Sequence, residues 1–172
     1  MMKKIVLLTL ITGLFAGFDA TAQQDKSKRP SPPAKVSETL ASGANISIDY
    51  SQPSLKGRTI GKDIVPYGEV WRAGANEATV FETDKDVKVE GQALPAGKYS
   101  FYAIPGAESW TLIFNKTWKQ WGTAYKQDDD ALRVNVKPTK AAAITEQMTF
   151  NIAKDGKVSL MWGDTQVDFS VQ

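Results

Sequence analysis

The residues best suited to chemistry gather in one long connection of the chain, residues 51–78, which carries the string VPYGEVWRAGANEAT. Aromatic, cationic and polar side chains lie close together there, and Gly74 would let a ligand approach the backbone. Long loops without secondary structure are uncommon in compact domains and are often functional. The candidate ligand-binding residues in and just after this loop are Lys56, Arg58, Tyr67, Trp71, Arg72, Asn76, Glu77 and Thr79.

The same residues also fit a purely structural role. In that interpretation Trp71 fills one end of the core, Arg72 pairs with Glu77 or stacks on an aromatic ring, and the glycines form turns. The aromatic residues Trp118, Trp121 and Tyr125 leave a similar choice open, because they could stack on a sugar or cover the end of the core. The loop composition marks a place for a site but specifies no chemistry.

The chain contains no Cys and no His, which limits the catalysis it could perform. Disulfides, Cys nucleophiles, the Ser-His-Asp triad and imidazole metal sites are all excluded. A carboxylate mechanism remains, for which Glu77 is the best single candidate, with Glu69 or Asp63 as its partner. The three aspartates at 128–130 lack the spacing of a calcium loop. We therefore predict no metal site and no cofactor.

The charge pattern does not favour nucleic acid as a partner. The net charge is +2, and residues of opposite sign are interspersed along the chain. No basic stripe is present that could follow a phosphate backbone. The partners that fit this composition are a small polar ligand, a glycan or a protein of the cell envelope.

The N-terminal residues are typical of a targeting sequence. Lys3 and Lys4 precede an apolar run over 5–18, and small residues at 20–22 fit a signal-peptidase site. The run is shorter than the about 20 apolar residues that a membrane-spanning helix needs. We predict a signal peptide over 1–22 and export to the periplasm, with secretion outside the cell as the alternative. Residues 23–35 are polar and rich in Pro, which predicts a flexible linker.

The remaining residues, 36–172, suit one domain, and their dominant hydrophobic period is two. About ten short strands with turns between them predict an antiparallel β-sandwich, with an open barrel as the second choice. The C-terminal part predicts a three-stranded meander over 148–152, 158–162 and 167–171. Its two turns, Asp155-Gly156 and Gly163-Asp164, tolerate the positive φ that tight hairpins require.

Five strings follow one another along the chain: PYGEVWRAGANEAT, LPAGKYSFYAIPG, WTLIFNK, WG and LRVNVKP. Together they resemble a family of secreted bacterial proteins known as domain of unknown function 2911 (DUF2911). The resemblance covers nearly the whole chain after about Pro33, and VWRAGANEAT is its most specific part. It implies export and one compact domain, but no activity, substrate or cofactor. The family signature it marks consists of Trp71, Arg72, Gly74, Asn76, Glu77 and Thr79.

Three functional hypotheses follow. The first is a non-catalytic envelope module that binds a small polar ligand, a glycan or a partner protein through the loop. The second is a carboxylate-dependent hydrolase or lyase acting on a glycan, in which Arg72 and Asn76 support Glu77. The third is a purely structural or assembly domain, in which the loop serves as a lid.

Overall fold

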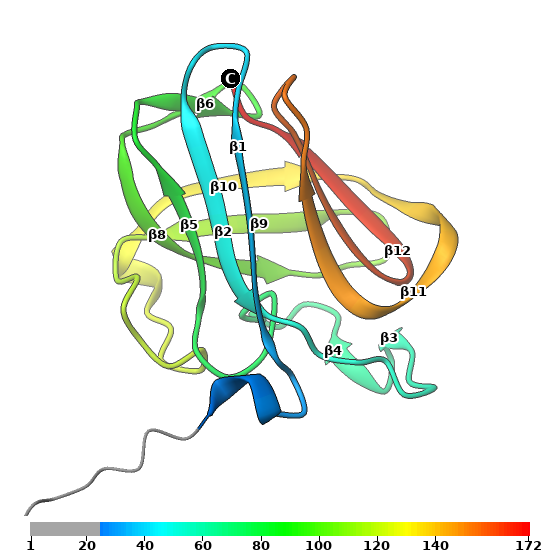
Figure 1. The fold of residues 1–172 in the computed structure, drawn as a ribbon. Coiled ribbons are helices and arrows are strands. Elements are labelled where there is room, and N and C mark those ends of the chain that lie inside the picture. The colour runs from blue at the N-terminus through cyan, green and yellow to red at the C-terminus, as the bar shows by residue number, and fades with distance from the viewer. Residues whose placement is uncertain (1–24) are drawn as a thin grey trace, which may run out of the picture.

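A computed structural model describes residues 25–172, so the predicted signal peptide over 1–22 lies outside the described residues and export stays a prediction. The described chain is built almost entirely from strands (Figure 1). These are β1 (Pro33–Thr39), β2 (Asn45–Ser51), β3 (Ile60–Gly61), β4 (Ile64–Pro66), β5 (Thr79–Thr83), β6 (Val87–Val89), β7 (Gln92–Leu94), β8 (Gly97–Ile104), β9 (Trp110–Asn115), β10 (Asp130–Val136), β11 (Pro138–Ile152) and β12 (Lys157–Ser170), with short 3-10 helices η1 (Lys26–Lys28) and η2 (Gln127–Asp129).

Six strands form the larger sheet, in the order β1-β2-β5-β8-β9-β10, and every neighbouring pair is antiparallel. The two-residue period of the sequence explains which face is buried. In β2, for example, Ile46, Ile48 and Tyr50 are buried, whereas Ser47 and Asp49 between them are partly exposed. β8 differs because it is buried on both faces, and its outer face is therefore covered by another part of the chain.

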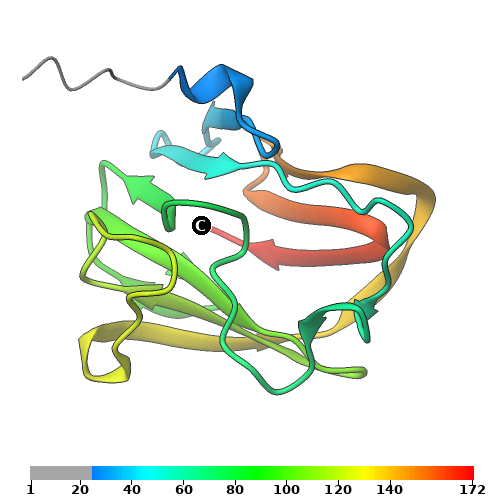
Figure 2. The ribbon, with the colours of Figure 1, turned by 90° about the horizontal axis from the view of Figure 1, so that it is seen from below.

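The smaller sheet consists of two long strands, β11 and β12, which contain the strand segments predicted for the C-terminal meander. The first hairpin turns at Asp155-Gly156 and pairs 149–152 with 158–161. β12 then reverses its direction (Figures 1 and 2). Gly163 (φ +61°) has the positive φ that a tight reversal needs. The amide of Val171 donates to the carbonyl of Gly156 at 2.8 Å, so the returning half of β12 lies against the first half.

Two features of the C-terminal half differ from the sequence expectation. β11 begins at Pro138, so residues 138–147 are a strand that the meander prediction did not include. These residues are mostly exposed and lack a buried stripe, and Ile144 is 75% exposed, which explains why the hydrophobic pattern did not indicate them. The second difference is that the segments before and after Gly163, which were predicted as two strands, form one continuous strand, β12.

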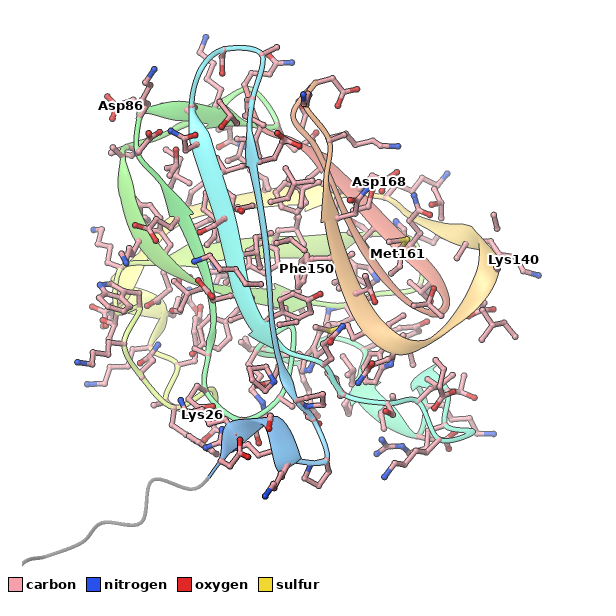
Figure 3. All side chains as sticks on the ribbon, in the orientation of Figure 1. Lys26, Asp86, Lys140, Phe150, Met161 and Asp168 are labelled. Atoms are coloured by element: carbon pink, nitrogen blue, oxygen red, sulfur yellow. The ribbon has the colours of Figure 1, made fainter. Side chains whose placement is uncertain are left out.

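The hydrophobic core lies between the two sheets, as a β-sandwich requires. The ring of Phe101 on β8 stacks on Phe169 of β12 at 5.7 Å and meets Phe150 of β11 edge-on at 5.9 Å. Phe114 on β9 contacts Phe169 edge-on at 6.2 Å. Figure 3 shows Phe150 in the interior between the sheets. These contacts across the two sheets confirm the sandwich that was predicted from the sequence.

The segment predicted to be a linker already contains ordered structure at its C-terminal end. β1 starts at Pro33, inside the predicted linker 23–35, and pairs with β2 along its whole length. Just before it, η1 lies below the sheet at the end of β1 (Figure 1). No helix within 25–172 has the length and apolar character needed to cross a membrane.

Candidate functional site

The connection between β2 and β5 carries most of the candidate residues, and its last part forms an extension of the larger sheet. Trp71 and Ala103 of β8 exchange two backbone hydrogen bonds, each 2.8 Å long. This strand-like pairing turns the Trp71 side chain towards the core. Its ring stacks on Trp162 at 5.7 Å and meets Trp110 edge-on at 6.2 Å. Trp71 therefore fills the core, as the structural interpretation expected.

Thr79 and Gly74 also serve the interior of the domain. Thr79 is fully buried, and its hydroxyl donates to the carbonyl of Ala73 at 2.9 Å. A Cβ atom at Gly74 would lie 2.8 Å from that hydroxyl, so a larger residue would disturb the contact. Ala73 itself has a positive φ of +45°. These residues close a tight loop and are not available to a ligand.

Asn76 and Glu77 hold the N-terminal segment of the described chain. The Arg29 guanidinium donates to both Glu77 carboxylate oxygens, at 2.8 and 3.1 Å, and the Lys26 ammonium lies 3.0 Å from the carboxylate. The side-chain amide of Asn76 donates to the carbonyl of Ser31 at 3.1 Å. Glu77 thus pairs with Arg29 and Lys26, and the ion pair with Arg72 that the sequence suggested is not formed.

These contacts determine the ionisation of Glu77. Partial burial alone would raise the pKa of the Glu77 carboxyl. The backbone N–H of the same residue and the hydrogen bonds from Lys26 and Arg29 outweigh burial, and the pKa of Glu77 is lowered from its ordinary value. The carboxylate is therefore ionised at neutral pH, which does not suit a general acid.

The two candidate residues nearest the start of the connection, Lys56 and Arg58, lie elsewhere. Lys56 is exposed, and its backbone N–H donates to Glu146 Oε1 at 2.8 Å. The guanidinium of Arg58 donates to the carbonyls of Leu55 at 3.0 Å and Ser54 at 2.9 Å. Arg58 is exposed but its donors are partly occupied by its own loop. The structure does not bring Lys56, Arg58 and Arg72 into one site.

Arg72 is one of the candidates that line a cleft. Because Trp71 points inward, its neighbours Val70 and Arg72 lie on the outer side of the sheet. There they line a cleft of about 300 Å³ together with Trp71, Tyr102, Gly122, Thr123 and Tyr125. The Nε atom of Arg72 is buried and has no hydrogen-bond partner within 25–172. Arg72 also takes no part in the ion pairs of these residues.

The walls of this cleft, which we call the Arg72 cleft, are aromatic and firmly held. The rings of Tyr102 and Tyr125 lie 5.0 Å apart. The Tyr102 hydroxyl accepts a hydrogen bond from Gln120 at 3.0 Å, and the Tyr125 hydroxyl donates to Asp130 at 2.7 Å. Burial, followed by the hydrogen bond to Asp130, raises the pKa of Tyr125 to about 12. Tyr125 is therefore neutral, and no anionic phenolate neutralises Arg72.

The loop after β9 covers the outer face of β8 and completes the cleft. Its Gly122 donates a backbone hydrogen bond to the carbonyl of Asn76 at 3.1 Å, and its Gln120 carbonyl accepts from Ala78 at 3.1 Å. A Cβ atom at Gly122 would lie 2.0 Å from Cδ of Arg72, so only glycine leaves room for the arginine stem. The sequence indicated aromatic residues in this loop but not that Gly122 and Thr123 meet Arg72.

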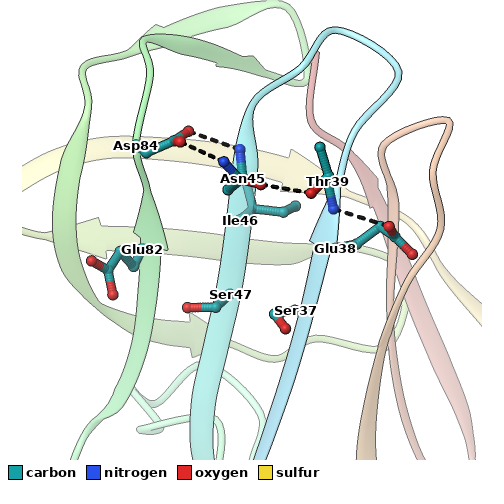
Figure 4. Close-up of a pocket in the computed structure, with 8 residues that line it drawn as sticks. All are labelled: Ser37, Glu38, Thr39, Asn45, Ile46, Ser47, Glu82 and Asp84. Carbon is teal, nitrogen blue, oxygen red and sulfur yellow. Dashed lines mark hydrogen bonds between the residues drawn. The ribbon is translucent and has the colours of Figure 1, made fainter.

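Another hollow of the described surface lies elsewhere, and polar side chains that line it hydrogen-bond to one another. It measures about 420 Å³ and lies over the outer face of β1, β2 and β5 (Figure 4). Asp84 accepts from the backbone and side chain of Asn45 at 2.7 and 2.6 Å, and Thr39 donates to Asn45 at 2.6 Å. The side-chain hydrogen bond from Asn45, then the backbone one, lowers the pKa of Asp84. Asp84, Asn45 and Thr39 therefore satisfy one another.

No cluster of potential ligands for a metal ion occurs among residues 25–172. Two of the three consecutive aspartates are engaged in the fold. Asp129 accepts a hydrogen bond from Thr117 at 3.0 Å, and Asp130 accepts from Asn115 and Arg133 at 2.9 and 2.7 Å. Their oxygens hold the start of β10 in place.

The described residues form a β-sandwich, and an arginine-lined, aromatic-walled cleft lies on the outer face of its larger sheet. The chain belongs to the family of proteins of unknown function DUF2911, whose sequence model matches residues 31–171. The match confirms the family resemblance seen in the signature strings. Comparisons with curated proteins and with solved structures found no match.

Proposed function

We propose that this DUF2911 domain is a non-catalytic binding module that holds a small organic carboxylate in the Arg72 cleft. One observation carries the proposal: Arg72 lines an open cleft, and its buried Nε has no hydrogen-bond partner within 25–172. A buried polar group without a hydrogen bond destabilises a fold, and a native protein keeps few of them. A bound anion would give Arg72 the charged partner that it lacks within 25–172.

The shape of the cleft narrows the ligand class. A guanidinium presents its donors as a planar fork that matches a carboxylate. Beside it, Val70, Tyr102 and Tyr125 offer apolar and aromatic surface. The volume of about 300 Å³ is at the small end of the range for small-molecule sites. A carboxylate attached to a flat apolar group fits these walls better than a hydrophilic anion such as inorganic phosphate.

The surroundings of Glu77 support binding over hydrolysis. A carboxylate hydrolase needs one carboxyl that carries a proton and a second carboxyl facing the same substrate. Glu77 is ionised and occupied by Arg29 and Lys26. Within the described chain no carboxylate lines the Arg72 cleft. The cleft therefore has the groups to hold an anion but not a pair of groups to cleave it.

Benzoate is a suitable probe, and benzamide is its neutral counterpart of nearly the same shape. We expect benzoate to bind the purified protein, measured by calorimetry and by NMR, and benzamide to bind more weakly. Arg72→Gln should weaken benzoate binding by about ten- to a hundred-fold, because a hydrogen bond to a charged group contributes about 1.5–3 kcal/mol. Gly122→Ala should weaken it too, since its Cβ displaces the arginine stem.

Arg58→Gln is the matched control, since it removes an arginine of the same connection that does not line the cleft. Benzoate binding should be unchanged in that variant. The proposal fails if benzoate and benzamide bind equally, or if Arg72→Gln and Arg58→Gln bind benzoate as the unmodified protein does. Circular dichroism of each variant checks that the fold is retained.

A further inference from the structure

A second cleft lies at the end of the sandwich where β12 reverses direction, and it shares no lining residue with the Arg72 cleft. It measures about 380 Å³. Four separate segments meet there: the stretch from Thr59 to Tyr67, the turn between β8 and β9, the start of β11 and the reversal of β12. We call it the Tyr67 cleft. Tyr67 is the only residue from the family's VPYGEVWRAGANEAT string that lines it.

Tyr67 is held in place although half of its side chain is exposed. The residue is 49% exposed. Its ring lies across Gly61 so closely that a Cβ there would be 2.3 Å from the ring, and Gly61 has a positive φ of +82°. The next residue, Gly68, donates to the carbonyl of Pro105 at 2.8 Å. An aromatic ring fixed in this way loses little conformational entropy when a ligand packs on it.

The backbone just before Tyr67 is strained. Val65 has a φ of +51°, a conformation that is a genuine outlier for a β-branched residue. Such strain costs on the order of 1–3 kcal/mol and clusters at ligand-binding sites. In this segment the strained Val65 and the packed Gly61 both determine where the Tyr67 ring lies. The side chain of Val65 also packs against the hydrophobic core.

The Tyr67 cleft is lined by charged side chains of both signs. Lys140 and Asp164 line the cleft together with Thr59 and Thr165. Neither Lys140 nor Asp164 joins the ion pairs of residues 25–172. Lys140 lies at the outer edge of the ribbon, where β11 begins (Figure 3). One cation and one anion leave the lining without net charge, in contrast to the Arg72 cleft, so they favour a neutral ligand with both donors and acceptors.

We propose that the Tyr67 cleft binds a neutral saccharide. A sugar ring carries C–H groups on its faces, which pack on the negative face of an aromatic ring. Its hydroxyls both donate and accept hydrogen bonds, so they can pair with a carboxylate, an ammonium and hydroxyl side chains at once. Tyr67 provides the ring, Asp164 accepts, Lys140 donates, and Thr59 and Thr165 do either. This site is independent of anion binding at Arg72, because the two clefts share no lining residue.

The probes are four neutral tetrasaccharides: cellotetraose, maltotetraose, mannotetraose and tetra-N-acetylchitotetraose. We expect at least one to bind at millimolar concentration and to shift the NMR signals of Tyr67 and Asp164. Tyr67→Ala should weaken that binding by about ten-fold, the loss expected for a stacking contact of about 1–1.5 kcal/mol. Tyr67→Phe should retain most of it, because the ring remains. Asp164→Asn should weaken binding, but the NMR signals of the Tyr67 ring should still shift when the tetrasaccharide is added.

Trp121→Ala is the matched control, because Trp121 is 53% exposed but lines neither cleft. It should bind the tetrasaccharide as the unmodified protein does. The inference is overturned if none of the four probes shifts the Tyr67 and Asp164 signals, or if Tyr67→Ala and Trp121→Ala bind equally well. Because benzoate tests a different cleft, failure here and failure of the carboxylate proposal are separate results.

Discussion

Trp71 and Arg72 are adjacent in the sequence, yet they face opposite sides of the larger sheet and have opposite surroundings. Trp71 is packed between Trp110 and Trp162 and closes the core. Arg72 lines an open cleft, and its Nε has no partner within 25–172. A similar contrast separates the two charged signature residues, because Glu77 has two cationic partners. Most of the signature therefore serves the fold, and Arg72 is the residue that the fold leaves unexplained.

Substitution of Trp71, the core residue of this pair, should have the largest effect on stability. Trp71→Ala removes a large ring from a packed site between two other tryptophans. We expect the free energy of unfolding to fall by about 3–5 kcal/mol, as in other large-to-small core substitutions of aromatic residues. Urea denaturation followed by circular dichroism measures this loss.

Trp118→Ala is the control for that substitution. Trp118 is 38% exposed, and the Lys98 ammonium lies over its ring, 5.1 Å from the ring centre. An exposed cation–π contact contributes about 0.5–1 kcal/mol, so the loss should be no larger than that. Equal losses in the two variants would show that Trp71 is not a core residue and would remove the contrast with Arg72.

The sequence predicted the sandwich well because its signals are local. Alternating residues of β2, β8, β9 and β10 and the turns at Asp155-Gly156 and Gly163-Asp164 each indicate structure within a few residues. The first part of β11 escaped prediction because its exposed residues carry no alternation. η1 escaped it because charged residues near three prolines are typical of a linker, and only the distant Glu77 holds Arg29.

The site was harder to predict than the fold. The signature string located Arg72, but it did not show which of its residues point outward, because that depends on the pairing of Trp71 with Ala103. The partners of Arg72 in the cleft, Tyr102 and Gly122, come from β8 and from the loop after β9. Contacts between segments so far apart leave no local pattern. The Tyr67 cleft was even harder to predict from the sequence, because four separate segments form it.

Glu77→Gln tests the ion pairs that the Glu77 carboxylate forms with Lys26 and Arg29. Its ion pairs are partly exposed, so we expect a loss of only about 1 kcal/mol in the free energy of unfolding at neutral pH after solvent screening. The pKa of Glu77 is lowered in the folded state. Its contribution is therefore present above the ordinary pKa of a glutamate, about 4.3, and is lost as the pH falls through the lower folded pKa.

Thermal unfolding of both proteins across the acid range measures this effect. The difference between the unmodified protein and Glu77→Gln should shrink as the pH falls below about 4 and then vanish. Hydrogen exchange of the amides of Ser27 and Arg29 should speed up in the variant, because Arg29 loses its carboxylate partner. Glu69→Gln is the control, since Glu69 is exposed and joins none of the ion pairs of the described residues. A pH-independent difference would mean that Glu77 acts through packing.

Arg72→Met removes the Arg72 guanidinium, which joins no ion pair within 25–172. This substitution should have the smallest effect on stability. Methionine keeps the apolar stem that packs against Gly122 and removes a guanidinium whose buried Nε has no hydrogen bond. Replacing an unsatisfied polar group with an apolar one of similar shape is neutral or stabilising, so we expect the free energy of unfolding to stay within about 0.5 kcal/mol or to rise. A structural role for Arg72 predicts the reverse, a loss of 1 kcal/mol or more. Urea denaturation decides between these outcomes, and a stable variant that no longer binds benzoate would mean that the domain keeps Arg72 for its ligand and not for its fold.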